Sequence, residues 1–329
     1  MLGREDTQDA VTMSDAAVIV VDMGGTKIAG GLADPSSRLS ARQVVPTWPG
    51  DGPGGIDALI TMIERLHEES RHTGTRIRAV GISVAGIVRH RSGIVHLAPN
   101  LRWHDFPLRE TLEARCGLPV AIGNDAKLAT LGEYHAGGAI AGETLFGLWI
   151  GTGVGGGIVR DGRILHGAHD AAGEIAYLLP ERAALGRRYP DLGALELAVA
   201  GPGIAGRAAA QLAASPGVVS TLRRSGSPPQ TADIFAAAQQ GDAVAGEILA
   251  ETLETLTLAI ANVAVVLDPD RIVFGGAVGL ALAPWHAAIV QRLVGRIPNV
   301  PSIFSATLGD AAPLVGAASI AWERVSPHE

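Results

Sequence analysis

Two glycine-rich turns carry residue types that bind phosphate. The first, Asp22–Lys27, reads DMGGTK and follows the apolar run Val18–Val21; the second, Gly151–Gly157, reads GTGVGGG and also follows an apolar segment. Glycine has no Cβ, so backbone N–H groups at such turns can approach an anion closely. The carboxylate of Asp22 could hold Mg²⁺ directly or through water. An ordinary hairpin is the simpler explanation of the first segment taken alone, so the rest of the sequence has to decide.

The second turn also matches the dinucleotide-binding pattern G-x-G-x-x-G. An acid, Glu174, even lies about twenty residues on, as that pattern expects. A Rossmann glycine loop must open a helix, however, whereas the sequence IVRDGRIL after this turn is typical of a hairpin. An NAD-dependent oxidoreductase therefore stays a minor alternative. No Walker sequence G-x-x-x-x-G-K-[ST] occurs.

A third glycine pair, Gly275-Gly276, follows the apolar segment RIVF and precedes an apolar helical pattern. Such a pair can cover the nucleoside of a nucleotide. It can equally shape the corner between a strand and a helix, and the sequence favours neither interpretation.

Asp125 is the candidate general base. It lies where a predicted strand, Pro119–Ile122, gives way to a predicted helix, Ala126–Tyr134. A carboxylate there can face a cleft and accept a hydroxyl proton as that oxygen attacks phosphorus. An ordinary helix N-cap is a strong competing explanation for an Asp at this position. Three further polar residues offer the donors and acceptors that sugar hydroxyl groups require: Asn100, Asn124 and Glu174.

The composition indicates a globular protein with a sizeable core. The 329 residues are 47% hydrophobic and 18% charged, and the net charge of −7 with scattered basic residues argues against nucleic acid as a partner. The one cysteine, Cys116, excludes an internal disulfide and fits a reducing cytoplasm. We expect a cytoplasmic protein without a membrane span, because the apolar run Leu256–Leu267 is too short to cross a bilayer. Residues 1–15 are expected to form a disordered tail.

The elements that must position these residues alternate between strands and helices. Strands are predicted at Ile77–Val84 and Thr144–Ile150, and helices at Gly55–Arg71 and over Thr231–Leu267, the latter with a break near Gly241. Each half begins with a strand, a glycine turn and a strand, which suggests an internal duplication. The sequence predicts a mixed α/β fold with functional residues at strand ends.

Seven segments in order resemble the ROK family of sugar kinases and sugar-responsive repressors. They are DMGGTK, SVAGIV, APNLRW, GNDAKLATLGE, IGTGVGGGI, GAHDAAGEIAY and LDPDRIVFGGAV. The resemblance implies a two-lobed actin/hexokinase-like fold, a duplicated ribonuclease H-like α/β arrangement with a cleft between the lobes. It places the first lobe at residues 16–125, with a helix at 313–326 packing back on it, and a larger second lobe at 126–312.

The resemblance also implies an ATP- and Mg²⁺-dependent kinase that phosphorylates the 6-hydroxyl of a hexose. Asp125 then acts as the base, and sugar contacts fall on Asn100, Asn124, Glu174, Tyr177 and Glu196. Phosphate, Mg²⁺ and nucleoside contacts fall on Asp22, Gly24, Gly25, Thr26, Lys27, Gly151, Thr152, Gly153, Gly275 and Gly276. Family members are commonly dimers or tetramers, so a homo-oligomer is expected. About fifteen residues precede the first strand, too few for the DNA-binding domain of the repressor branch. A non-catalytic sugar sensor remains the alternative from a different class.

The chain departs from the family where a structural zinc is usually held by E-x-G-H followed by C-x-C-G-x-x-G-C-x-E. Four other residues stand at the ligand positions: Tyr177, Arg187, Tyr189 and Ala194. We therefore predict no structural zinc there, and expect packing or an ion pair of Arg187 to hold the loop. His166 and His169, without further ligands at metal spacing, are weak evidence for a metal.

Asp170 stands where the family usually has glycine. A solvent-facing loop acid is the favoured interpretation. The sharper hypothesis is that Asp170 or His169 contacts the substrate and prefers an amino group on the hexose, since a desolvated carboxylate–ammonium contact discriminates well. Branches of the family that lack zinc include kinases of amino sugars in antibiotic pathways, such as kanosamine or glucosamine.

Overall fold

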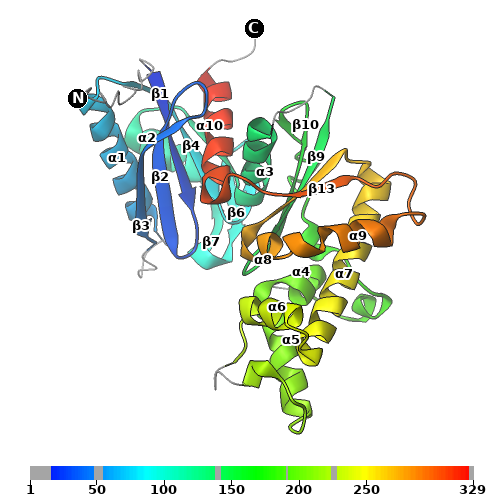
Figure 1. Ribbon diagram of the computed structural model, residues 1–329. Helices are drawn as coiled ribbons and strands as arrows, with labels where there is room; N and C mark the ends of the chain where they lie inside the picture. Colours follow the sequence, from blue (N-terminus) through cyan, green and yellow to red (C-terminus); the bar gives the residue numbers. More distant parts are fainter. Residues whose placement is uncertain (1–15, 48–54, 138–141, 190–191, 224–227, 326–329) are drawn as a thin grey trace, which may run out of the picture.

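The computed structural model describes residues 16–47, 55–137, 142–189, 192–223 and 228–325 (Figure 1). One large sheet forms in each half of the chain, and two helices lie between the sheets. The predicted tail at residues 1–15 lies outside the described residues.

The first sheet has the order β3-β2-β1-β4-β8. Its strands are β1 (Ala16–Met23), β2 (Lys27–Ala33), β3 (Leu39–Pro46), β4 (Arg76–Val84) and β8 (Val120–Asn124). β1 and β2 form the predicted hairpin around the first glycine turn, and β1, β4 and β8 run parallel. Parallel strands bring their carboxyl ends to one edge of the sheet, so Asp22 and Asn124 lie near that edge.

The apolar run of β1 is explained by burial on both faces of this sheet. Ile19 and Val21 pack in the cluster that contains α1 (Ile56–His72) and α2 (Leu108–Cys116). Val18 and Val20 pack instead with residues of α10 (Ala312–Val325). A strand covered on both faces has no polar side, so its sequence is continuously apolar.

The second sheet has the order β11-β10-β9-β12-β13. Its strands are β9 (Thr144–Ile150), β10 (Val154–Arg160), β11 (Arg163–Ile164), β12 (Arg271–Gly275) and β13 (Ser302–Ser305). As in the first sheet, an antiparallel hairpin is followed by parallel neighbours, here β12 and β13, which agrees with the predicted duplication. The second glycine turn is shorter than predicted, because Gly155, Gly156 and Gly157 belong to β10. A Cβ on Gly157 would overlap Thr130, so glycine here makes room for a neighbouring helix.

A small sheet of β5 (Ile87–Arg89), β6 (Ile94–Ala98) and β7 (Trp103–Phe106) was not predicted. Its strands are short, and the exposed His104 and Asp105 hide the apolar signal of their buried neighbours Val95 and Trp103. A 3-10 turn at Pro99–Leu101 joins β6 to β7 and carries Asn100.

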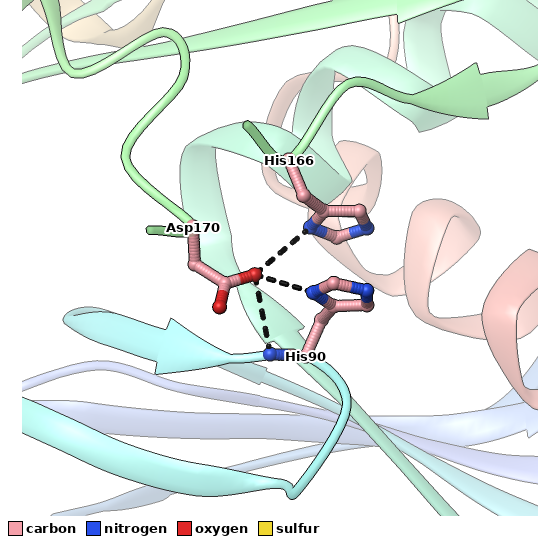
Figure 2. Close-up of side chains that lie close together, drawn as sticks. All are labelled: His90, His166 and Asp170. Atoms are coloured by element: carbon pink, nitrogen blue, oxygen red, sulfur yellow. Dashed lines mark hydrogen bonds and ion pairs between the residues drawn. The ribbon is translucent and has the colours of Figure 1, made fainter. Parts of the chain in front are cut away.

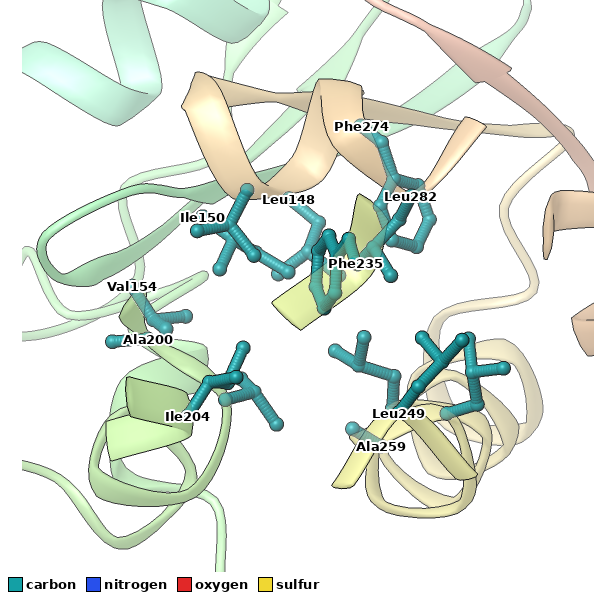
Figure 3. Packing of buried hydrophobic residues seen from close by; sticks show 14 of the residues in the cluster. Leu148, Ile150, Val154, Ala200, Ile204, Phe235, Leu249, Ala259, Phe274 and Leu282 are labelled. Atoms are coloured by element: carbon teal, nitrogen blue, oxygen red, sulfur yellow. The ribbon is translucent and has the colours of Figure 1, made fainter. Parts of the chain in front are cut away.

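Most remaining helices pack on the second sheet and on one another (Figure 3). They are α4 (Ala194–Val199), α5 (Gly201–Ala214), α6 (Thr231–Gln239), α7 (Ala243–Leu267), α8 (Gly276–Ala281) and α9 (His286–Leu293). The predicted break near Gly241 is confirmed, and Asp242 caps α7 by accepting from the backbone N–H of Ala245 at 3.1 Å.

Helix α7 spans 25 residues, longer than the apolar run that we judged too short for a bilayer. Among the described residues it alone has the length and composition to cross a membrane, which is weak evidence because soluble core helices meet the same criterion. Leu249, Leu253, Leu256 and Ile260 of α7 are buried in the core of the second half, as expected of a core helix.

Helices α3 (Asp125–Ala136) and α10 cross between the two large sheets (Figure 1). A Cβ on Gly132 would overlap the carbonyl of Ala312, and a Cβ on Gly316 would overlap the carbonyl of Leu128. The two backbones therefore touch directly at the crossing. At the far end of α3, the Glu133 carboxylate accepts from the backbone N–H groups of Thr307 and Leu308 at 2.7–3.0 Å.

Candidate functional site

The N-cap of α3 is Asn124, not Asp125. Asn124 Oδ1 accepts from the backbone N–H of Lys127 at 3.0 Å, which satisfies one of the free donors at the helix start. The amide nitrogen of Asn124 donates to Asp125 Oδ1 and to the Gly86 carbonyl, both at 2.9 Å. Helix capping therefore does not explain why an Asp stands at position 125.

Asp125 is electrostatically poised to exchange a proton near neutral pH. Burial of its carboxyl, with the neighbouring carboxylates of Asp22 and Glu174, raises the pKa of Asp125 from 3.8 to about 7. Hydrogen bonding from the backbone N–H of Ala126 opposes that rise. A carboxylate with such a pKa is the ordinary arrangement for a general base.

The first glycine turn is held firmly at the carboxyl end of β1. The Thr47 hydroxyl donates to the Gly24 carbonyl at 2.9 Å, and a Cβ on Gly25 would lie 2.8 Å from Cβ of Asn100. The turn therefore rests against the 3-10 turn that carries one predicted sugar ligand. Burial raises the pKa of Asp22, whose Oδ1 accepts from the Ser83 hydroxyl at 2.5 Å.

The exposed Lys27 completes the first turn. Its ammonium lies 2.7 Å from a carboxylate oxygen of Asp310, which belongs to the loop before α10. Lys27 and Lys127 are the only lysines in the chain.

The second glycine turn is braced by Glu196. Oε2 of Glu196 accepts from the backbone N–H of Val154 at 2.7 Å, and a Cβ on Gly153 would lie 2.9 Å from the same oxygen. Burial raises the pKa of Glu174, and the negative charge of Glu196 adds to that rise, so Glu196 acts electrostatically on a predicted sugar residue as well as on the turn. The same turn is tied to α5, since the Gly201 N–H donates to the Gly151 carbonyl at 2.8 Å.

The third glycine pair has a sufficient structural explanation. A Cβ on Gly275 would overlap the Trp149 ring, and a Cβ on Gly276 would overlap the Ile150 backbone. Gly276 also has φ +74°, a left-handed conformation that favours glycine. The pair lets the β12–α8 corner pack tightly on β9, in agreement with the structural interpretation left open above.

Lys127 is a site residue that the sequence analysis treated only as part of a helix. Its side chain is 4% exposed, and its ammonium donates to the Asp170 carbonyl and lies 3.9 Å from Glu174 Oε1. Burial lowers the pKa of Lys127, whereas burial raises the pKa of Glu174 and the lysine lowers it. The charge of Lys127 therefore favours the ionised form of Glu174 against the effect of burial, and its bond to the Asp170 carbonyl ties this loop to α3.

Asp170 does not face solvent, so the favoured interpretation of this residue is wrong. Its side chain is 14% exposed, and its Oδ1 accepts from the His90 imidazole while lying 3.6 Å from His166 Nδ1 (Figure 2). Hydrogen bonding and charge from His90 lower the pKa of Asp170 against the effect of burial. His169 is exposed beside this group.

Packing holds the segment that carries the altered zinc positions. Ile175, Ala176 and Leu195 are buried, and a Cβ on Gly193 would overlap the Ala176 carbonyl. Tyr177 is 47% exposed, so its hydroxyl is accessible. Arg187 is exposed, and the part of the chain that the structure describes shows no acidic partner for it.

The two sheets of matching topology define an actin/hexokinase-like fold, and the chain belongs to the ROK family, whose match covers residues 18–324. It is 33% identical to a glucokinase of Streptomyces coelicolor over 322 residues (93% of this chain, 97% of that one) and 31% identical to an N-acetylmannosamine kinase of Citrobacter koseri over 313 residues (93% and 98%). A solved ROK glucokinase from Streptomyces griseus in complex with glucose and AMPPNP superposes with TM-score 0.73 at 30% identity, covering 93% and 99% of the two chains. The predicted family and fold are confirmed.

Proposed function

We propose that this protein transfers the γ-phosphoryl group of ATP to the 6-hydroxyl of a hexose, with Asp125 as the general base. The wider class, an ATP-dependent sugar phosphotransferase, is confirmed by the family and by the kinases among its relatives. The observation that carries the finer proposal is the Asp125 carboxylate, which has a pKa of about 7 and is oriented by Asn124.

For the other residues we propose the roles that the resemblance to the family implies. Asn100, Asn124 and Glu174 would bind sugar hydroxyl groups near Asp125, with Tyr177 and Glu196 at the edge of that group. The first two glycine turns would receive the phosphates through Gly24, Gly25, Thr26, Gly151, Thr152 and Gly153, with Lys27 beside them. Gly275 and Gly276 would lie near the nucleoside.

The oxygen donors at the first turn fit Mg²⁺. Asp22 offers a carboxylate at the end of β1, and Thr26 offers an exposed hydroxyl two residues from Gly24. Oxygen ligands of this kind are those that Mg²⁺ prefers, and the ion neutralises phosphate charge when bound. This chain's own residues then orient the sugar and remove the proton from its hydroxyl.

The substrate is proposed to be glucose or an amino-hexose. Oδ1 of Asp170 already accepts a hydrogen bond from His90. The hypothesis that this carboxylate contacts an amino group of the substrate is therefore weaker than it was from the sequence alone. The substrate can be identified by measuring ATP consumption, and formation of the 6-phosphate by NMR, on a panel of sugars. The panel contains glucose, mannose, N-acetylmannosamine, glucosamine and kanosamine. No turnover on any sugar would favour the sugar sensor, and turnover that requires a nicotinamide would favour the oxidoreductase.

We further propose a cytoplasmic homo-oligomer whose lobes divide near Asp125, with α10 belonging to the first lobe. Support comes from α10, which packs against β1 and β4 although it follows the second sheet in sequence.

A further inference from the structure

We propose that His90, His166 and Asp170 form a binding site for a divalent transition-metal ion of the Zn²⁺ type. The three residues come from distant parts of the chain: His90 follows β5, whereas His166 and Asp170 lie in the loop after β11. One ligand atom from each lies within 4.8 Å of the other two.

The three side chains bring their ligand atoms close together at one place. The two imidazole rings are stacked with centroids 3.7 Å apart and planes 10° from parallel, and both Nδ1 atoms face the Asp170 carboxylate (Figure 2). His166 Nδ1 is 3.6 Å from Asp170 Oδ1, which is longer than a hydrogen bond. A tetrahedral Zn²⁺ with bonds near 2.1 Å separates its ligand atoms by about 3.4 Å. Because the lone pair of each imidazole nitrogen lies in the plane of its ring, one ring must rotate out of the stack before both nitrogens and the carboxylate can reach one ion.

The donor set selects the class of metal. Two imidazole nitrogens and one carboxylate oxygen suit Zn²⁺, Co²⁺ or Ni²⁺ and differ from the all-oxygen sets that Mg²⁺ and Ca²⁺ prefer. Three protein ligands leave a fourth position for water. The side chains of His90 and His166 are about one-third exposed, so an ion can enter from solvent.

The loop at Asp170 has a left-handed backbone and is tied to α3. Its φ of +60° is a left-handed conformation that costs a non-glycine residue stability. The Asp170 carbonyl also accepts from Lys127, which lies next to Glu174. An ion here would join the end of β5 to the loop that carries Glu174, at a place separate from Tyr177, Arg187, Tyr189 and Ala194.

The test is calorimetric titration of the full-length, chelator-stripped protein with ZnCl₂, supported by Co²⁺ absorption and thermal shift. The expected result is one Zn²⁺ per chain with Kd below about 10 µM and a raised Tm. His166→Ala and Asp170→Gly should each weaken binding more than tenfold. Asp170→Gly should also fold well, because glycine accepts the positive φ.

His104→Ala is the matched control, because His96, His104 and Asp105 form a second, exposed histidine–carboxylate group in the small sheet. This variant should bind Zn²⁺ as the unmodified protein does. The proposal is overturned if the unmodified protein binds no Zn²⁺ in this range, if both site variants bind normally, or if only His104→Ala loses the ion.

Discussion

The side-chain amide of Asn124 lies 2.9 Å from Oδ1 of Asp125, so the residue that caps α3 also orients the carboxylate beside it. From the sequence, Asp125 could have been both the cap of α3 and the proposed base. In the structure Asn124 is the cap. With the capping task removed, the carboxylate is free to act on a substrate.

Replacing Asp125 by Asn should lower kcat by about 10²–10⁴-fold, because the variant cannot accept the hydroxyl proton. Coupled measurement of ADP release on the best sugar of the panel gives the rate, and circular dichroism checks the fold. Asp57→Asn, at an exposed acid in the first turn of α1, is the matched control and should keep full turnover. Near-normal turnover in Asp125→Asn would remove this residue from the mechanism.

The activity should depend on pH through the same group. With the pKa of Asp125 raised to about 7, the carboxyl is protonated below that pH and cannot accept a proton. We expect kcat/KM to fall tenfold for each pH unit below about 7 and to level off above it. A profile that stays flat between pH 5 and pH 8 would contradict the assignment.

Stability should change in the opposite sense. Because the folded-state pKa of Asp125 is raised above 3.8, the folded protein holds this proton more tightly than the unfolded chain. This bound proton contributes at most about 4 kcal/mol to the free energy of unfolding. The contribution is complete below pH 4 and is lost as the pH rises through 7. Asp125→Asn stays neutral, so its free energy of unfolding relative to the unmodified protein should increase between pH 5 and pH 8. Denaturant melts of both proteins measure this, and a constant difference would refute it.

The two lysines should separate sugar binding from nucleotide binding. Lys127→Met removes the cation beside Glu174, so KM for the sugar should rise about tenfold, a change of about 1.4 kcal/mol. The pKa of Glu174 should rise as well, because the lysine no longer stabilises the carboxylate. On acidification, the affinity for the sugar should therefore begin to fall at a higher pH than in the unmodified protein. Lys27→Met should instead raise KM for ATP. If both variants changed the KM values for the sugar and for ATP alike, Lys127 would not be specific to sugar binding, nor Lys27 to nucleotide binding.

The crossing of α3 and α10 should be intolerant of side chains. Gly316→Ala places a methyl group against the Leu128 carbonyl, and we expect a loss of about 1–3 kcal/mol in the free energy of unfolding. Gly246→Ala is the control: Gly246 lies inside α7 with no atom within 4 Å of its Cβ position, so alanine should stabilise by about 0.5–1 kcal/mol. Urea melts distinguish the two, and equal effects would show that the crossing is loosely packed.

The sequence predicted local features well and distant contacts poorly. The first hairpin, the strand at 144–150 and the helix break near Gly241 depend on residues close together in the chain, and all three are confirmed. His90 lies far in sequence from His166, so no spacing could reveal that the two rings stack. The burial of Lys127 was hidden for a similar reason, because its Asp170 and Glu174 neighbours belong to a loop folded over the start of α3.

The direct backbone contact between α3 and α10 also bears on how the protein could move. Where helices meet through glycine and carbonyl atoms, turning about the contact disturbs few neighbours, whereas sliding along the axis drives side chains into one another. We therefore expect any rotation between the two large sheets to centre on this crossing. Asp125 stands seven residues from Gly132, about 10 Å along the same helix. Placed so near the crossing, the carboxylate would move less in such a rotation than the more distant parts of each sheet.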